Sequence, residues 1–527
     1  MTKSKLYPIG IQTFSRIIRE GYIYVDKTDL MWQMTRLSPF IFLSRPRRFG
    51  KSLLSTTLEA YFSGEKDLFK GLKIMQLEKD WKKYPVIRID LSTGKNKKTA
   101  GELCRYLHLV LDEVNKFGNN PKEKTPGERL HGMIRRAYQQ TGLQVVVIID
   151  EYDAPILDFL HKEDTLVEVR QVMQEFYEPL KASESMIKFC FITGITKFSQ
   201  LSIFSTINNL NDVSMLPRFA NICGITEQEL VTTMSEDINI LAESQRISRE
   251  QMHQLLKERY DGYHFSEDSD EVYNPYSLLK CFANQKLAKY WFDSGTPSFL
   301  INKMRDFNTN ITRVDDLEVP VSAFDKPTEA MTTALPLLYQ SGYLTIKGYN
   351  HETMIYSLSV PNREVRIGYT EGLLPSYTGV EPEDVQAGFA MKFWKCLKEG
   401  NLNQALHELQ IYLESIPYIE GFKKKLQETS NAEGFYEYTL YLIFSMLNVY
   451  VNTQVKCRGG RIDVAILMPD TTYILELKTR GTAKEALEQI TEKNYAIPFQ
   501  SGGRKVVRAG LLFDIESPTL KEWRISQ

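Results

Sequence analysis

Residues 45–52, Arg-Pro-Arg-Arg-Phe-Gly-Lys-Ser, decide the fold of the N-terminal part of this chain. The apolar run 40–43 before them predicts a short buried strand, and residues 52–62 after them have helical spacing. The Gly-Lys-Ser triplet therefore lies at a strand-to-helix turn, which is the context that a phosphate-binding loop requires. We expect Gly50 to admit phosphate to the backbone, Lys51 to reach the outer phosphates and Ser52 to ligate Mg²⁺.

This loop departs from the common G-x-x-x-x-G-K-S pattern. Arg45 stands in place of the first glycine, and Pro46 removes one N–H donor. Support comes from the β-branched run 145–149, which ends in Asp150 and Glu151 and is typical of a central parallel strand. We expect Asp150 to hold Mg²⁺ through water and Glu151 to orient an attacking water. The alternative is a buried strand that ends in a solvated acidic turn.

Two further runs, 84–90 and 187–194, also have the composition of strands. The second contains Thr193 at its end, where a hydroxyl could sense a terminal phosphate; a plain turn is the alternative. Strands separated by helical stretches predict an α/β fold with a mostly parallel sheet and with ligand at the carboxyl ends of the strands. Lys51, Asp150 and Thr193 all fall at such ends.

A second group of charged residues lies near the end of the chain. Residues 461–467 and 473–478 predict a hairpin between a helix that opens at Glu433 and an amphipathic helix over 483–495. This order is typical of a restriction-endonuclease-like core. Asp463 and Glu476 come from adjacent strands, and Lys478 shares a face with Glu476. Two carboxylates around Mg²⁺ with a lysine beside the attacking water are the chemistry of a metal-dependent nuclease. A solvated strand face is the alternative for Glu476 and Lys478.

Several short motifs along the chain carry a family resemblance. They are residues 7–10 (Tyr-Pro-Ile-Gly), 24–28 (Tyr-Val-Asp-Lys-Thr), 45–52, 150–153 (Asp-Glu-Tyr-Asp), 260–265 (Tyr-Asp-Gly-Tyr-His-Phe), 274–279 (Asn-Pro-Tyr-Ser-Leu-Leu) and 294–297 (Ser-Gly-Thr-Pro). Together they resemble the predicted AAA-ATPase-like proteins common in gut bacteria, whose fold is akin to the STAND-type ATPases. The resemblance implies nucleotide binding by the whole loop, Arg48 and Phe49 included, and makes Arg45 a family variant.

The same resemblance extends to the C-terminal part, which is similar to the PD-(D/E)xK nuclease module often fused to this ATPase. It implies that Glu433 is the helix carboxylate, Asp463 and Glu476 are the metal ligands, Lys478 positions water, and Gln489 with Tyr495 supports the site near phosphate. Packing or helix-surface roles are the alternative for the last two. Basic residues that could contact phosphates flank the site. They are Lys456, Arg458, Arg461, Arg480 and Lys484.

Bulk composition limits the function classes. The 527 residues are 43% hydrophobic and 11% aromatic, which supports several folded domains and excludes a disordered chain. The formal charge of −1 gives no global basic field, so any nucleic-acid surface must be local. Six scattered cysteines indicate neither a zinc cluster nor a disulfide framework. With no apolar leader in residues 1–13 and no membrane-length apolar run, a cytoplasmic protein without a membrane partner is expected.

We expect four regions. Residues 1–222 would form the P-loop ATPase core, 223–375 a helical lid with a winged-helix-like part, 376–420 a linker and helical hairpin, and 421–527 the nuclease-like domain. The winged-helix assignment rests on a helix, strand and return strand over 335–362, where few basic residues favour protein packing over DNA binding.

The expected function is an ATP-binding switch, with ATP and Mg²⁺ as cofactors, coupled to an Mg²⁺-dependent nuclease that acts on DNA. The sequence leaves open whether the chain forms a homo-oligomer. One alternative is a signalling or scaffold ATPase whose inactive nuclease fold only binds nucleic acid or protein. Another is a nucleotide binder in which Arg45 and Pro46 have removed hydrolysis.

Overall fold

The structure is a computed structural model. It describes residues 6–94, 97–157, 159, 163–197, 209–292, 298–307, 309, 314, 317–327, 331–378, 387–415, 426, 431–446, 450–457, 460–500, 504–517 and 519–526. Arg458 and the 294–297 motif lie outside these residues. The chain forms two compact units, of which unit 1 is Met1–Thr309 with Asp316–Glu364 and unit 2 is Asn310–Asp315 with Val365–Gln527. The finer division into four regions stays a prediction.

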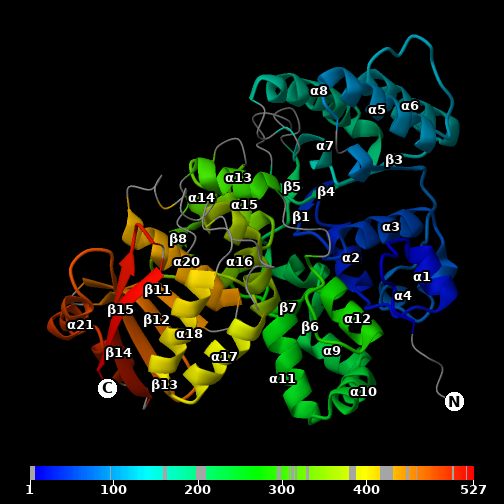
Figure 1. Ribbon diagram of the computed structural model, residues 1–527. Coiled ribbons are helices and arrows are strands. Elements are labelled where there is room, and N and C mark those ends of the chain that lie inside the picture. The colour runs from blue at the N-terminus through cyan, green and yellow to red at the C-terminus, as the bar shows by residue number, and fades with distance from the viewer. Residues whose placement is uncertain are drawn as a thin grey trace. The chain divides into compact units, whose positions relative to one another are not determined.

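The centre of unit 1 is a five-stranded sheet in the order β2-β3-β4-β1-β5, and every neighbouring pair in it is parallel (Figure 1). Its strands are β1 (Phe40–Ser44), β2 (Val86–Asp90), β3 (Val145–Asp150), β4 (Ile187–Gly194) and β5 (Asn211–Asp212). The four strand-like runs of the sequence are thus β1 to β4, and the short β5 was not predicted. Parallel strands end at the same edge, so the segments after β1, β3 and β4 meet there.

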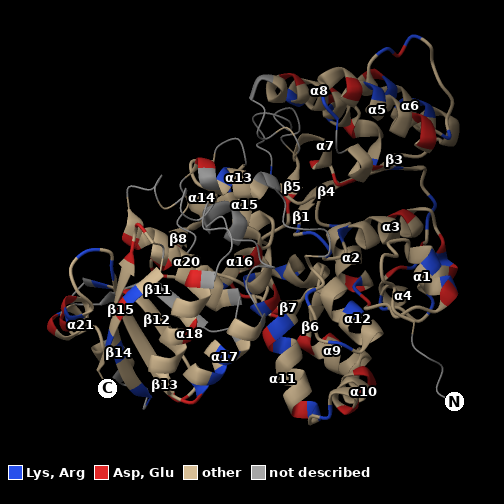
Figure 2. Cartoon of the chain, viewed as in Figure 1, with Lys and Arg blue, Asp and Glu red and all other residues tan. Residues whose placement is uncertain are grey.

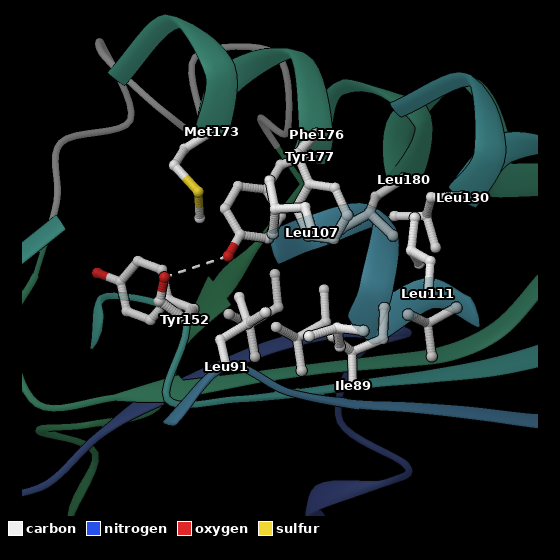
Figure 3. Packing of buried hydrophobic residues seen from close by; sticks show 14 of the residues in the cluster. Ile89, Leu91, Leu107, Leu111, Leu130, Tyr152, Met173, Phe176, Tyr177 and Leu180 are labelled. Carbon is white, nitrogen blue, oxygen red and sulfur yellow. Dashed lines mark hydrogen bonds between the residues drawn. The ribbon is translucent and has the colours of Figure 1, made fainter. Parts of the chain in front are cut away.

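Helices cover both faces of this sheet, which explains why β1 and β3 are buried along their whole length. Val145, Val147 and Ile149 belong to a buried cluster with residues of α5, α6 and α8. Figure 3 shows part of this cluster, in which Ile89 and Leu91 lie on the sheet side and Leu107, Leu130 and Phe176 on the helix side. In that cluster the Tyr177 hydroxyl donates to the backbone oxygen of Tyr152 at 3.2 Å. Helix α3 lies on the other face (Figure 1). The helices of this part are α1 (Phe14–Glu20), α2 (Thr28–Met34), α3 (Lys51–Phe62), α4 (Ile74–Leu77), α5 (Ala100–Val114), α6 (Pro126–Thr141), α7 (Ala154–Leu157) and α8 (Glu163–Ala182).

The rest of unit 1 is mainly helical, as the sequence predicted. Thr226 and Glu229 form a capping box at the start of α9. The elements are β6 (Ile225–Thr226), α9 (Glu227–Thr233), α10 (Ser235–Gln245), α11 (Arg249–Tyr260), β7 (Val272–Tyr273), α12 (Pro275–Asn284), α13 (Ser298–Asp306), β8 (Leu317–Pro320), α14 (Val321–Phe324), α15 (Leu335–Gln340), β9 (Thr345–Asn350) and β10 (Ile355–Ser359). Helix α15 with the antiparallel pair β9 and β10 has the predicted helix, strand and return-strand order, and β8 adds a third strand to β10.

Unit 2 is built on a mixed sheet in the order β11-β12-β13-β14-β15. Only the β13 and β14 pair is parallel, and its crossover contains α21. The elements are α17 (Ala387–Lys398), α18 (Leu402–Ser415), α20 (Ala432–Met446), β11 (Tyr450–Cys457), β12 (Gly460–Leu467), β13 (Thr471–Lys478), α21 (Ala483–Glu492), α22 (Ile497–Gln500), β14 (Lys505–Asp514) and β15 (Thr519–Ser526). The predicted hairpin is therefore β12 and β13, while β11 and β15 were not predicted.

Helix α16 (Arg363–Thr378) begins in unit 1 and continues into unit 2. It includes residues 376–378 of the region 376–420 that was predicted to be a linker and helical hairpin, and residues 379–386 lie outside the described part of the chain. No helix among the described residues is long and apolar enough to cross a membrane.

Candidate functional site

The turn between β1 and α3 has the backbone of an anion-binding loop. Gly50 precedes the first residue of α3 and has φ +96°, a conformation that side-chain-bearing residues rarely adopt. The first N–H groups of α3 therefore open toward the space beyond β1, where an anion is favoured. Lys51 is buried, and its ammonium donates to the backbone oxygen of Pro46 at 3.1 Å.

Asp150 meets the start of α3 at the carboxyl end of β3. Its Oδ2 accepts a hydrogen bond from the Ser55 hydroxyl at 3.1 Å, and the Ser52 side chain also lies close enough to lower its pKa. Its Oδ1 accepts no hydrogen bond of normal geometry from the described residues. Burial, followed by the neighbouring Glu151, raises the pKa of Asp150 to about 6. A buried carboxylate with an unused oxygen beside Ser52 is a suitable outer ligand for Mg²⁺.

Glu151 connects this carboxylate to the loop lysine. It follows β3 in a left-handed conformation with φ +52°, and its Oε1 lies 3.7 Å from the Lys51 ammonium. A residue without glycine's freedom is uncommon in that conformation, and such residues often occur at functional sites. Gly50, Lys51, Ser52, Asp150 and Glu151 are thus brought together at one edge of the sheet.

Thr193 lies at the same edge but its hydroxyl is already engaged. It is buried, and it donates to the backbone oxygen of Leu43 in β1 at 2.7 Å. The sequence predicted no specific role for Asp153, but this residue holds the turn after β4. Its Oδ2 accepts from the backbone N–H groups of Ile195 and Thr196 at 3.0 and 2.7 Å and from the Thr196 hydroxyl at 2.7 Å. Phosphate sensing by Thr193 stays a prediction.

The loop side chains before Gly50 point into the helical part of unit 1. The Arg48 guanidinium donates to the backbone oxygen of Tyr290 at 2.7 Å and stacks 3.9 Å from the centre of the Tyr276 ring. Phe49 is buried, with ring centres 4.8 Å from Tyr263 and 5.2 Å from Phe265. Nucleotide contact by Arg48 and Phe49 stays a prediction, and these two side chains anchor the loop.

Arg45 explains why the first glycine of the common motif can be replaced. Its guanidinium is buried and donates to four backbone oxygens. They belong to Ser44 (2.9 Å), Ser214 (2.7 Å), Phe219 (3.0 Å) and Ala220 (3.3 Å). The side chain thus bridges the end of β1 to the segment after β5. Hydrogen bonds from both terminal nitrogens, with the Phe265 ring centre 4.2 Å from the guanidinium carbon, offset the cost of burying this cation, although its Nε has no hydrogen-bond partner among the described residues.

A second chain of contacts leads from the loop to α16. The Trp291 indole donates to the backbone oxygen of Arg47 at 3.4 Å. The backbone N–H groups of Tyr290 and Trp291 donate in turn to Oε1 of Glu364 at 2.6 and 3.0 Å. Glu364 is buried in the first turn of α16. Residues 290–291 therefore lie between the phosphate loop and the helix that leaves unit 1.

An apolar pocket opens beside Gly50. Its empty space, with the adjoining open solvent included, is about 660 Å³. Its walls come from the N-terminal residues 23–27, from α3, from residues 222–225 and from α12. A mostly apolar hollow next to this turn is a candidate position for a nucleobase.

In unit 2 the predicted carboxylates share one face of the sheet. The β12 and β13 ladder pairs Val464 with Leu475, and the next position in this register places Asp463 opposite Glu476. The ladder is open there, because the Leu477 N–H donates to Oδ2 of Asp463 at 2.8 Å. Opposed residues of an antiparallel pair project to the same side. The two carboxyl groups are therefore neighbours.

Glu476 is the more constrained of the two acids. It is 2% exposed, and its Oε1 accepts a hydrogen bond from the Gln489 amide of α21. Its Oε2 accepts no hydrogen bond from the described residues. Burial and then the Asp463 carboxylate raise the pKa of Glu476 to about 8, and burial raises the pKa of Asp463 to about 6. Two acids that resist losing their protons together favour a cation between them.

Of the remaining predicted residues, Lys478 and Glu433 lie near this pair. Lys478 follows Glu476 by two residues on β13 and so projects from the same face of the strand, and its positive charge lowers the pKa of both carboxyl groups. Glu433 on α20 accepts from the Thr479 N–H at 3.2 Å. Tyr495 is buried in the apolar cluster under α21. Arg461, Arg480 and Lys484 are exposed.

The donor set fits a divalent ion of the Mg²⁺ class. No group of three or more His, Cys, Asp and Glu side chains in the described part of the chain is arranged to hold a metal. Asp463 and Glu476 supply two carboxylates, and Glu476 has an unused oxygen. Mg²⁺ is commonly held by one or two carboxylates, with water and substrate phosphates completing its shell. In Figure 2 the positions of acidic and basic residues alternate along the ribbon of both units.

Together, the phosphate-binding turn and the paired carboxylates define a P-loop α/β module and a nuclease-like α/β module in one chain. The chain belongs to the family of predicted AAA-ATPases that carry a nuclease-like domain. Residues 8–204 match the family described as "Predicted AAA-ATPase", and residues 431–523 match the PD-(D/E)XK nuclease superfamily. The chain is also 32% identical over 532 residues to the "Uncharacterized protein in vnfD 5'region" of Azotobacter chroococcum mcd 1, with 98% of each chain covered.

Sequence reasoning missed three parts of the first site. The pocket residues 222–225 have no local signature, since their role depends on their position next to α3. The carbonyl cage around Arg45 depends on a segment far along the chain. Asp153 could have been found, because an acid just after a buried strand frequently caps the neighbouring turn.

Proposed function

We propose that this protein is an ATP-binding switch coupled to an Mg²⁺-dependent phosphodiesterase that acts on DNA. The observation that carries the proposal is the carboxylate centre of unit 2. There Asp463 and Glu476 lie on one face, Lys478 lies nearby, and Oε2 of Glu476 has no hydrogen-bond partner among the described residues.

In unit 1, Gly50 and the first N–H groups of α3 would bind the phosphates of ATP. Lys51 would exchange its contacts with Pro46 and Glu151 for the outer phosphates. Ser52 and Asp150 would hold Mg²⁺, and Glu151, released from Lys51, would orient water. The apolar pocket beside Gly50 would take the base.

In unit 2, Asp463 and Glu476 would hold the divalent ion, and Glu433 would support the backbone at Thr479. A bound ion supplies charge stabilisation at the phosphate and a more acidic water. Lys478 would donate to the attacking water or to the phosphate and hold it in line. Gln489 keeps Oε1 of Glu476 engaged and so fixes the orientation of that carboxylate. The exposed Arg461 and Arg480 would contact flanking phosphates of DNA.

The nuclease half is tested with supercoiled and linear DNA, Mg²⁺ and ATP. We expect the wild-type protein to cleave and Lys478→Ala to leave the DNA intact. Lys493→Ala, an exposed lysine just after α21, is the matched control and should cleave as the wild type does. Intact DNA with the wild type and with Lys478→Ala alike would favour the scaffold alternative.

The switch half is tested with binding and turnover of ATP. We expect Lys51→Ala to abolish ATP binding while the far-ultraviolet circular dichroism stays unchanged. Loss of ATP binding should also remove any effect of ATP on DNA cleavage. ATP binding by the wild type without phosphate release would identify a nucleotide binder that does not hydrolyse.

A further inference from the structure

Helix α21 rests directly on the backbone of β14 at Gly510. A Cβ atom added at this glycine would lie 2.2 Å from the backbone oxygen of Ala483 and 2.5 Å from the backbone nitrogen of Leu487. It would also lie 2.8 Å from the Cβ of Ala486. Two of these three atoms are backbone, so no side-chain rotation can relieve the overlap. The glycine therefore sets how closely the helix approaches the strand.

This contact lies beside the carboxylate centre. Gly510 pairs in register with Glu476 of β13. On α21, Ala483, Ala486 and Ile490 face the sheet and are buried. Gln489, on the same helix, donates its amide to Oε1 of Glu476. Glu476 thus lies beside Gly510, and α21, which carries Gln489, rests on Gly510.

The hydrogen bond depends on that close approach. A glutamine amide stops being a useful donor once the heavy-atom distance grows beyond about 3.5 Å. A methyl group at position 510 would have to move the backbone of α21 outward to reach an ordinary contact distance. The Gln489 amide moves with its helix, whereas the backbone of Glu476 is held in place, because β13 pairs with β14 along its whole length and with β12 as far as Leu475.

We propose that Gly510 is a positioning residue of the carboxylate centre, because it lets α21 lie close enough for Gln489 to orient Glu476. The inference rests on the proposed function in treating this centre as a divalent-ion site. Gly510 does not touch the ion or the DNA; it acts through Gln489.

The test measures Mn²⁺ affinity by calorimetry on the full chain, because this readout needs no DNA cleavage. Gly510→Ala and Gln489→Leu should each weaken Mn²⁺ binding about tenfold, as loss of a group that orients a metal ligand commonly does. The double variant should bind Mn²⁺ no more weakly than the weaker-binding single variant, because both substitutions remove the same hydrogen bond between Gln489 and Glu476. Gly388→Ala is the control. This glycine on α17 is exposed, and a Cβ there meets no described atom within 4 Å.

Ala486→Val crowds the same contact from the helix side and replaces Gly510→Ala should that variant fail to fold. It should show the same tenfold loss and the same lack of additivity with Gln489→Leu. Normal Mn²⁺ affinity in folded Gly510→Ala or Ala486→Val would overturn the inference and leave the proposed function standing. Losses that multiply in the double variant would also overturn it. A wild-type protein that binds no Mn²⁺ would refute both.

Discussion

Glu476→Gln should stabilise unit 2 in the absence of metal, although it removes a charged group from a predicted active site. The substitution keeps the size of the side chain and still offers an oxygen to Gln489. It removes a carboxyl group that burial and Asp463 hold at a pKa of about 8, against an ordinary value of 4.5.

The sign and size follow from linkage. The pKa of this carboxyl group is higher in the folded state than in the unfolded state, so the folded state keeps the proton to a higher pH. Below pH 4.5 both states are protonated, and the group does not lower the free energy of unfolding. Its cost grows as pH rises, because the unfolded chain ionises first, and it is complete above pH 8. At pH 7 the cost is up to about 3 kcal/mol, at roughly 1.4 kcal/mol per pH unit. For a unit of this size, 3 kcal/mol raises the melting temperature by roughly 6 to 12 °C.

The assay is thermal unfolding of the wild type and Glu476→Gln at pH 5, 7 and 8.5, with chelator and with excess Mg²⁺. In chelator the variant should melt higher, and the gap should widen with pH. Mg²⁺ at a hundred times its dissociation constant should add about 2.7 kcal/mol to the wild type and less to the variant. Glu492→Gln, an exposed carboxylate at the end of α21, should show neither effect.

The reasoning fails if Glu476→Gln melts lower than the wild type in chelator at pH 8.5. It fails equally if Mg²⁺ stabilises both proteins by the same amount, because Glu476 would then not be a ligand.

Three further predictions concern unit 1. Arg45→Lys should lower the free energy of unfolding by about 3 kcal/mol in chemical denaturation, since one ammonium cannot satisfy the four backbone oxygens that the guanidinium reaches; a loss below about 1 kcal/mol would contradict the carbonyl cage. Thr193→Val should cost about 1 kcal/mol of stability through the lost bond to Leu43 and leave ATP affinity within about twofold, whereas a large loss of affinity would support phosphate sensing. Mg²⁺-dependent ATP binding should weaken as pH falls below 6, by up to about tenfold per pH unit, because Asp150 takes up its proton there; Asp150→Asn should bind weakly and without this pH dependence in the same titration.

The regular elements of the fold could be predicted because their signals are local. The run 187–194 and strand β4 coincide, and the hairpin over 461–478 is β12 with β13. Burial on both faces produces continuous β-branched runs that can be read directly. Short strands such as β5 carry no such signal, because two residues are too few for a pattern.

The direction of single side chains was harder to predict. Membership in a loop motif suggested that Arg48 and Phe49 contact the nucleotide, which stays a prediction, but it gave no sign of their contacts with Tyr290 and Tyr263, more than two hundred residues later in the chain. Gln489 could be paired with Glu476 only through a resemblance, since the approach of α21 depends on Gly510 in a later strand. Contacts of this kind depend on tertiary packing, which leaves no periodic trace in the sequence.

The anchoring of Arg45, Arg48 and Phe49 makes this phosphate loop a poor candidate for transplantation. A chimera with a glycine-rich loop from an unrelated enzyme could keep the turn at Gly50, but it would lose the ties to residues 214–220, 263–265 and 290. In such a hybrid, nucleotide bound at the Gly50 turn would no longer be linked to those segments of unit 1. Protein engineers who wish to retune the nucleotide response would therefore do better to alter the partners of the loop than the loop itself.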